Sequence, residues 1–138
     1  MDIYIGNDHG GYDMKLIIMD LLNKKGINVI DYGSSSEEIV RYPYYASKVC
    51  SKVSEGKAGR GILICSTGIG MSIIANKYPN IRAALCTTSY MAKMTRRHNN
   101  SNILCLGGKI TVIAEAIEIV KVWIEEEYEG GRHDISLG

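Results

Sequence analysis

The sequence has no excess of charge of one sign and no long apolar run. Sixteen basic residues stand against fifteen acidic ones, for a formal net charge of +1, and no basic run interleaved with aromatic residues marks a nucleic-acid surface. No apolar stretch reaches the roughly 18 residues of a membrane span, and the first residues, MDIYIGNDHGG, lack the features of a secretion signal. We therefore expect no nucleic-acid partner, no membrane partner and a cytoplasmic location.

Closely spaced cysteines are missing as well. The four cysteines, Cys50, Cys65, Cys86 and Cys105, are far apart and include no C-x-x-C pair. This spacing indicates neither a zinc knuckle nor a small disulfide scaffold. We expect four reduced thiols, three of which pack as small apolar side chains.

The pattern that is present is an alternation of short apolar segments with longer segments of helical character. The length of 138 residues and the 46% hydrophobic fraction fit one domain covering 1–138. Because parallel strands need long crossover connections, this alternation predicts an α/β domain with a parallel sheet. The predicted strands are 2–6, 27–33, 61–65, 81–86 and 102–108, and the predicted helices are about 12–25, 43–55, 70–77, 88–98 and 111–128.

The residues that follow each strand are the candidates for chemistry, because ligands of an open parallel sheet bind beyond the carboxyl ends of its strands. The first strand ends in GNDHGG (6–11). Asp8 and His9, side by side before two glycines, suit the binding of sugar hydroxyls or of a phosphate. Aspartate and histidine are also common in turns and helix caps, so both interpretations stay open here.

The segment CSTGIG (65–70) places a thiol at the end of the third strand, before small residues and a helix start. Glycines let the backbone approach a ligand and a helix N-terminus presents free N–H groups, so this loop is a cradle for an anion. The nucleotide-binding patterns do not fit the segment, which leaves a phosphate or a reaction oxyanion as the occupant. A thiol beside such donors ionises more easily and then serves as a base or nucleophile; the alternative is an inert buried cysteine.

His98 and Asn99 close the fourth predicted helix, and topology sets them apart from Cys65. A helix that follows a parallel strand runs back along the sheet, so these residues lie at the amino edge and can join the Cys65 site only from another subunit. Basic groups also suit a helix C-terminus, so a solvated cap is the alternative. The tail that holds Arg132 lies at the same edge and suits a phosphate grip, whereas Lys109 lies back at the carboxyl edge.

Taken together, these residues resemble the ribose-5-phosphate isomerase B family, which also includes the galactose-6-phosphate isomerase subunits. The matching segments cover nearly the whole chain in the same order. They are DHGG (8–11), YPYYA (42–46), GILICSTGIGMSIIANK (61–77), NIRAALC (80–86), RRHNNSNILCLGGK (96–109) and YEGGRH (128–133).

The resemblance implies a doubly wound, Rossmann-like sheet of five parallel strands with helices on both faces. It also implies a homodimer or dimer of dimers with shared sites, no metal or other cofactor, and reversible isomerisation of ribose 5-phosphate and ribulose 5-phosphate through an enediolate. In this family the thiol at the position of Cys65 moves the proton between C1 and C2, while some members use a Glu at the position of Met71. With Cys65 and Met71 in place, the chain resembles the thiol-using members.

The resemblance assigns roles to the remaining candidates. Thr67 and His98 help to open the sugar ring, and Asp8 and Asn99 bind hydroxyls, with Asn99 and His98 supplied by the neighbouring subunit. The other substrate-binding positions are the backbone amides of Ser66, Gly68, Ile69 and Gly70 around the enediolate oxygens, Tyr42 on the pocket wall, and His9, Lys109 and Arg132 on the phosphate side.

Three positions depart from the family pattern. Ser66 replaces a common Gly, which is tolerated at negative φ, Arg41 stands where an acid is common, and Ser136 stands where a second Arg is usual. Losing a bidentate phosphate donor leaves two alternatives open: an isomerase of a six-carbon phosphate such as allose or galactose 6-phosphate, and a sugar-phosphate-binding regulator without turnover. A nucleotide- or flavin-binding module on the same architecture is a third.

Overall fold

The computed structural model describes residues 1–34, 42–56 and 59–138. Five parallel strands form one sheet in the order β2-β1-β3-β5-β4. The strands are β1 (Asp2–Asn7), β2 (Asn28–Asp31), β3 (Gly59–Cys65), β4 (Ala83–Leu85) and β5 (Ile103–Gly107). The chain leaves β1 toward β2 and then crosses to the other side of β1 for β3. The sheet is therefore doubly wound, and its switch point lies between β1 and β3.

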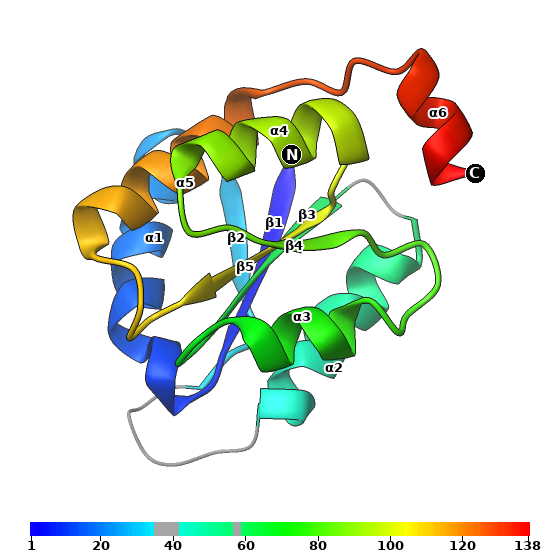
Figure 1. Cartoon of the computed structure of the whole chain (residues 1–138). Coiled ribbons are helices and arrows are strands. Elements are labelled where there is room, and N and C mark those ends of the chain that lie inside the picture. The colour runs from blue at the N-terminus through cyan, green and yellow to red at the C-terminus, as the bar shows by residue number, and fades with distance from the viewer. Residues whose placement is uncertain (35–41, 57–58) are drawn as a thin grey trace.

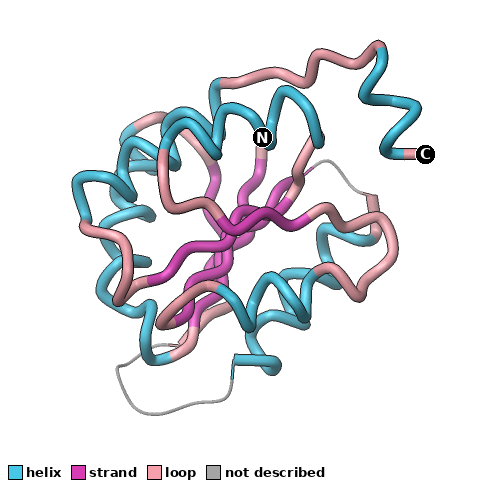
Figure 2. The backbone as a smooth tube through the Cα atoms, viewed as in Figure 1, coloured by secondary structure: helices cyan, strands magenta, loops and turns pink. Residues whose placement is uncertain are grey.

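Helices cover both faces of the sheet (Figure 1). One face carries α1 (Tyr12–Lys24), α4 (Ser89–Asn99) and α5 (Ile113–Glu125), and the other carries α2 (Tyr42–Ser54) and α3 (Ile69–Ala75). A 3-10 turn, η1 (His9–Gly11), joins β1 to α1, and a short helix, α6 (Arg132–Leu137), ends the chain outside these layers. Coloured by element type, the backbone shows the strands enclosed between the two helical layers (Figure 2).

Two apolar cores, one on each face, follow the alternation of the central strand. Successive residues of a strand point to opposite faces, so Ile62 and Ile64 of β3 pack in the core that α1 and α5 cover. Leu63 and Cys65 pack in the core that α2 and α3 cover. The Cys65 side chain therefore lies at the carboxyl edge of the sheet, on the face that α2 and α3 cover.

The fold class and the doubly wound sheet predicted from the sequence are confirmed. Gly26 and Gly56, at φ of 76° and 74°, follow the ends of α1 and α2, a position and conformation in which glycine commonly ends a helix. The second and fourth strands are shorter than the segments 27–33 and 81–86, and η1 and α6 had not been predicted, because three to six residues give no readable periodicity. In the described part of the chain, no helix is both long and apolar enough to cross a membrane.

Candidate active site

Three loops meet where β1, β3 and β5 end, beside the switch point of the sheet. The Gly108 amide donates to the Cys65 carbonyl at 2.7 Å, and the Lys109 amide donates to the Ser66 carbonyl at 3.0 Å. A Cβ built on Gly108 would lie 2.2 Å from the carbonyl oxygen of Gly10, and a Cβ on Gly10 would lie 2.2 Å from Ser66 Oγ. Only glycine lets the loops come this close.

Gly108→Ala is expected to destabilise the protein by about 1–3 kcal/mol, the usual cost of forcing an atom into packed structure. The added Cβ meets the Gly10 backbone, which cannot rotate away. Urea unfolding measures the loss as a lower midpoint. Gly26→Ala measures a separate cost, that of a side chain at a φ of 76° in open space, which Gly108→Ala does not incur because Gly108 is not among the described glycines at positive φ. A Gly108→Ala midpoint equal to that of the unsubstituted protein would contradict the close contact.

Cys65 ends β3 with its sulfur turned toward the glycine loop. The side chain is 5% exposed, and its Sγ accepts a hydrogen bond from the Gly68 amide at 3.1 Å. Gly68 adopts φ of 81°, a left-handed conformation that favours glycine. The loop therefore places a backbone N–H donor directly against this sulfur.

Some backbone amides of the loop between β3 and α3 donate hydrogen bonds to side chains of the same segment. Besides the Gly68 amide, which Cys65 engages, the Ile69 amide donates to Thr67 Oγ1 at 3.2 Å. Thr67 and Ile69 are exposed at the mouth of the loop. Ser66 is not among the non-glycine residues that the described chain holds at positive φ, so a serine is accommodated where the family commonly has glycine, as predicted.

The other three thiols differ from Cys65 in their surroundings. Burial raises the pKa of Cys50 and of Cys86 to about 12. Cys105 lies on β5 with no exposed surface, and burial raises its pKa well above the ordinary value. All four cysteines are free thiols, and these three pack as apolar side chains, as the sequence predicted.

Asp8 follows β1 at the same edge of the sheet. Its amide donates to the Ile64 carbonyl at 3.1 Å, which fixes Asp8 beside the residue that precedes Cys65. Its Oδ1 caps η1 by accepting from the Gly10 amide at 2.8 Å. Burial raises the pKa of the Asp8 carboxyl, and the Gly10 amide and the charge of His9 offset this only in part. The remaining predicted residues at this edge are His9 in η1, Gly70 in the first turn of α3 and Lys109 after β5.

His98 and Asn99 lie at the opposite edge, as the topology predicted. They end α4, and the next strand begins at Ile103, which pairs with Gly61, four residues before Cys65 on β3. At roughly 3.3 Å per residue, that step is about 13 Å of strand. Within one chain, the two side chains are therefore separated from the sulfur by the length of the sheet.

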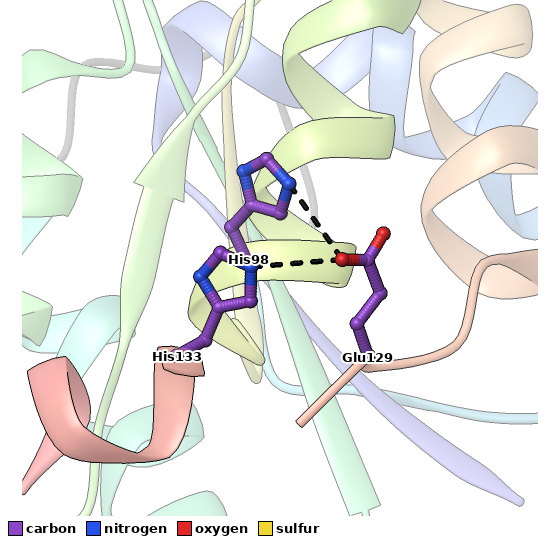
Figure 3. Close-up of side chains that lie close together, drawn as sticks. All are labelled: His98, Glu129 and His133. Atoms are coloured by element: carbon purple, nitrogen blue, oxygen red, sulfur yellow. Dashed lines mark ion pairs between the residues drawn. The ribbon is translucent and has the colours of Figure 1, made fainter. Parts of the chain in front are cut away.

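The structure joins His98 to two residues of the C-terminal tail, Glu129 and His133 (Figure 3). The two imidazole rings stack with centroids 4.3 Å apart and planes 17° from parallel. Glu129 Oε1 lies 3.9 Å from His98 Nε2 and 3.6 Å from His133 Nε2. The Glu129 amide donates to the Arg97 carbonyl at 3.0 Å, which fastens the tail to the end of α4.

Comparison with known proteins supplies the family. The model of the family described as ribose/galactose isomerase matches residues 3–137. The chain belongs to this family. It is 51% identical to ribose-5-phosphate isomerase B of Clostridium thermocellum, with a TM-score of 0.97 over 100% of this chain and 93% of that chain.

Two further members of the ribose/galactose isomerase family support the assignment. Ribose-5-phosphate isomerase B of Escherichia coli K12 is 44% identical over 95% of this chain and 88% of its own length. The structure of ribose-5-phosphate isomerase B of Mycoplasma genitalium, with bound ribulose-5-phosphate, is 37% identical with a TM-score of 0.95, over 99% of this chain and 91% of that chain. The resemblance drawn from the sequence motifs is thereby confirmed.

The His98, Glu129 and His133 group has ligand atoms within 4.8 Å of one another, but its orientation does not suit a metal ion. A neutral imidazole binds a cation through a ring nitrogen, in the plane of the ring. Because the two rings stack nearly parallel, a cation in the plane of one ring lies well out of the plane of the other. The group fits a carboxylate placed between two imidazole rings instead.

The family positions of the tail and of α2 are placed as follows. Arg132 begins α6 and is exposed, and its Nε donates to His133 Nε2 at 3.4 Å. Ser136, where the family usually has a second arginine, is exposed in the same helix. Tyr42 begins α2, but its side chain lies outside what the structure describes, and so does Arg41.

A cavity of about 330 Å³ lies between β4 and α4 and includes Asn99 in its lining, together with Leu85, Tyr90 and Met91. Tyr90 is 69% exposed and Met91 is 40% exposed, so apolar surface continues from the cavity across α4. Strand β4 is an edge of the sheet. One helix, α4, therefore carries both the exposed apolar side chains and His98.

Proposed function

We propose that this chain interconverts ribose 5-phosphate and ribulose 5-phosphate, with Cys65 as the base. The observation that carries the proposal is the hydrogen bond from the Gly68 amide to Cys65 Sγ, at the end of β3 in a chain of this family. The relatives support the choice of sugar. The Escherichia coli relative is named ribose-5-phosphate isomerase B, and the Mycoplasma genitalium structure contains ribulose-5-phosphate.

The proposed reaction moves one proton between adjacent carbons. The Cys65 thiolate takes the proton from C2 of the open-chain aldose, the electrons move onto O1, and an enediolate forms. The proton of the 2-hydroxyl then passes to O1, C2 becomes a carbonyl carbon, and the thiol returns its proton to C1. The backbone N–H groups of Ser66 to Gly70 that the loop does not itself engage stabilise the negative oxygens, and such stabilisation is commonly the largest contribution to catalysis. The amides of Gly68 and Ile69 take part only when the substrate displaces their bonds to Cys65 Sγ and Thr67 Oγ1.

The substrate is held by side chains from both edges of the sheet. Asp8 and Asn99 bind the hydroxyls and Tyr42 lines the pocket. Thr67 and His98 open the furanose ring before the proton transfer begins. The phosphate is bound by His9, Lys109 and Arg132.

A second copy of the chain completes each site in this proposal. Cys65 and His98 lie at opposite edges of one sheet, so the His98 that acts on a given substrate belongs to a neighbouring chain. The end of α4 must then lie at the interface, and the exposed Tyr90 and Met91 on the same helix supply apolar surface for it. A homodimer or a dimer of dimers satisfies this requirement, and we place the protein in the cytoplasm, where its thiols stay reduced.

Initial rates on ribose 5-phosphate, allose 6-phosphate and galactose 6-phosphate test the proposed sugar. We expect kcat/KM to be at least about tenfold higher for ribose 5-phosphate, since a pocket built for five carbons discriminates by about that much per added carbon. Faster turnover of a six-carbon sugar phosphate would mean that this sugar is the substrate and that the isomerisation chemistry is the same. If calorimetry shows binding of ribose 5-phosphate and no sugar is turned over, the protein would instead be a sugar-phosphate-binding regulator. That alternative is motivated by Ser136, which stands where the family usually has a second arginine.

A further inference from the structure

The Glu129 carboxylate faces three cationic or titratable side chains. Its Oε1 approaches His98 and His133, and its Oε2 lies 3.9 Å from Arg97 Nη1. Arg97 has a closer partner, because Glu126 Oε2 lies 2.9 Å from its Nε. Since Glu126 takes up the guanidinium charge, the Glu129 carboxylate is left mainly to the two rings (Figure 3).

The two rings stack with centroids 4.3 Å apart, and Arg132 Nε donates a hydrogen bond to His133 Nε2. His98 Nε2 faces the Glu129 carboxylate at 3.9 Å. In the proposed ring opening this imidazole gives a proton to the sugar, and a carboxylate beside an acid of this kind stabilises its charged form.

We propose that Glu129 is a positioning residue for His98: it holds the ring in its stacked orientation and stabilises the imidazolium that opens the sugar ring. The backbone supports this role, because the Glu129 amide is bound to the carbonyl of Arg97, the residue before His98. The inference rests on the proposed function, since it takes His98 as the ring-opening acid.

The ring-opening step balances as follows. The bond between C1 and O4 of the furanose breaks, O4 takes a proton from His98, and the anomeric hydroxyl loses its proton to water as the aldehyde forms. Water returns a proton to the imidazole before the next turnover. When the Glu129 carboxylate is absent, His98 loses both its fixed orientation and the charge that stabilises its acid form.

This role matters only for a sugar whose ring must be opened. Ribose 5-phosphate enters the site as a furanose, whereas erythrose 4-phosphate is an acyclic aldose, because its 4-oxygen carries the phosphate and no other hydroxyl can close a five-membered ring. The reverse reaction of ribulose 5-phosphate cannot serve for the comparison, because the equilibrium constant fixes the ratio of kcat/KM in the two directions. Loss of ring-opening catalysis therefore slows turnover of ribose 5-phosphate and not of erythrose 4-phosphate.

The test is Glu129→Gln, which keeps the size of the side chain and removes its charge. We expect kcat/KM to fall by at least about tenfold for ribose 5-phosphate, a part of the 10²–10⁴-fold effect of acid catalysis, and by less than about twofold for isomerisation of erythrose 4-phosphate. Glu129→Asp should restore part of the lost rate. Glu127→Gln is the matched control, since Glu127 is an exposed carboxylate of the same segment, and it should leave the rates on both sugars unchanged.

Two outcomes overturn the inference. An equal fall for ribose 5-phosphate and erythrose 4-phosphate would mean that Glu129 supports the structure or the binding of phosphate, and unchanged rates on both sugars would mean that His98 does not depend on it. His98→Ala separates the inference from the proposed function. If that variant slows only ribose 5-phosphate while Glu129→Gln slows neither sugar, the inference alone fails. If it slows both sugars equally, the assigned role of His98 fails and the inference falls with it.

Discussion

Cys65→Ala is expected to lower kcat for ribose 5-phosphate by about a thousandfold, within the 10²–10⁴ range that a positioned base supplies. The affinity for the sugar phosphate should stay nearly the same, because the proposed contacts to hydroxyls and phosphate come from other side chains. Exchange of the C2 hydrogen with deuterated water, followed by NMR, measures the proton transfer, and calorimetry measures the binding. Near-normal exchange in this variant would refute Cys65 as the base.

Cys50→Ala is the matched control for that experiment. Cys50 has no exposed surface and lies in the same apolar core as Cys65, and burial raises its pKa to about 12. Replacing it removes the same atom from the same core and leaves the carboxyl edge of the sheet intact. Exchange at C2 should continue at the normal rate; a loss as large as that of Cys65→Ala would point to packing rather than to proton transfer.

A mixture of inactive Cys65→Ala and inactive His98→Ala chains is expected to recover about a quarter of the unsubstituted activity if sites are shared across a two-fold dimer. Random exchange makes half of the dimers hybrids, and each hybrid has one site with both Cys65 and His98. The assay is turnover of ribose 5-phosphate after the chains have exchanged, with exchange itself followed by native mass spectrometry.

The control mixture replaces the His98→Ala chain with a chain that carries both substitutions, because that pair cannot rebuild a site. Any activity in this control measures residual turnover of the single variants. Absence of recovery in the first mixture, with hybrid dimers present, would contradict a site built from two chains and would return His98 to the role of a solvated helix cap.

The fold, and the candidate-site residues at one edge of the sheet, could be predicted because the features that specify them lie close together in the sequence. The run GILIC (61–65) is apolar at every position after the glycine, as a central parallel strand buried on both faces must be. The glycines after α1 and α2 mark their ends. Because a helix after a parallel strand must run back, even the separation of His98 from Cys65 followed from the order of elements.

The pairing of His98 with the tail could not be predicted in this way. Glu129 and His133 are 31 and 35 positions beyond His98 in the sequence, and no strand register or helical period links them to α4. Their approach depends on how the chain turns after α5. That turn is held by the hydrogen bond from the Glu129 amide to the Arg97 carbonyl and by the ion pair between Arg97 and Glu126, before the short helix α6 begins. The contact between Gly10 and Gly108 is hidden from sequence reasoning for the same reason.

The shielding of three sulfurs in the two cores has a chemical consequence. Alkylating agents and peroxides attack the thiolate form, and burial keeps Cys50, Cys86 and Cys105 in the thiol form at physiological pH. The folded chain therefore shields three of its four thiols from electrophiles and oxidants. In the proposed mechanism, oxidation of the fourth thiol, Cys65, would stop catalysis, so mild oxidation would inactivate the protein without cross-linking its buried cysteines.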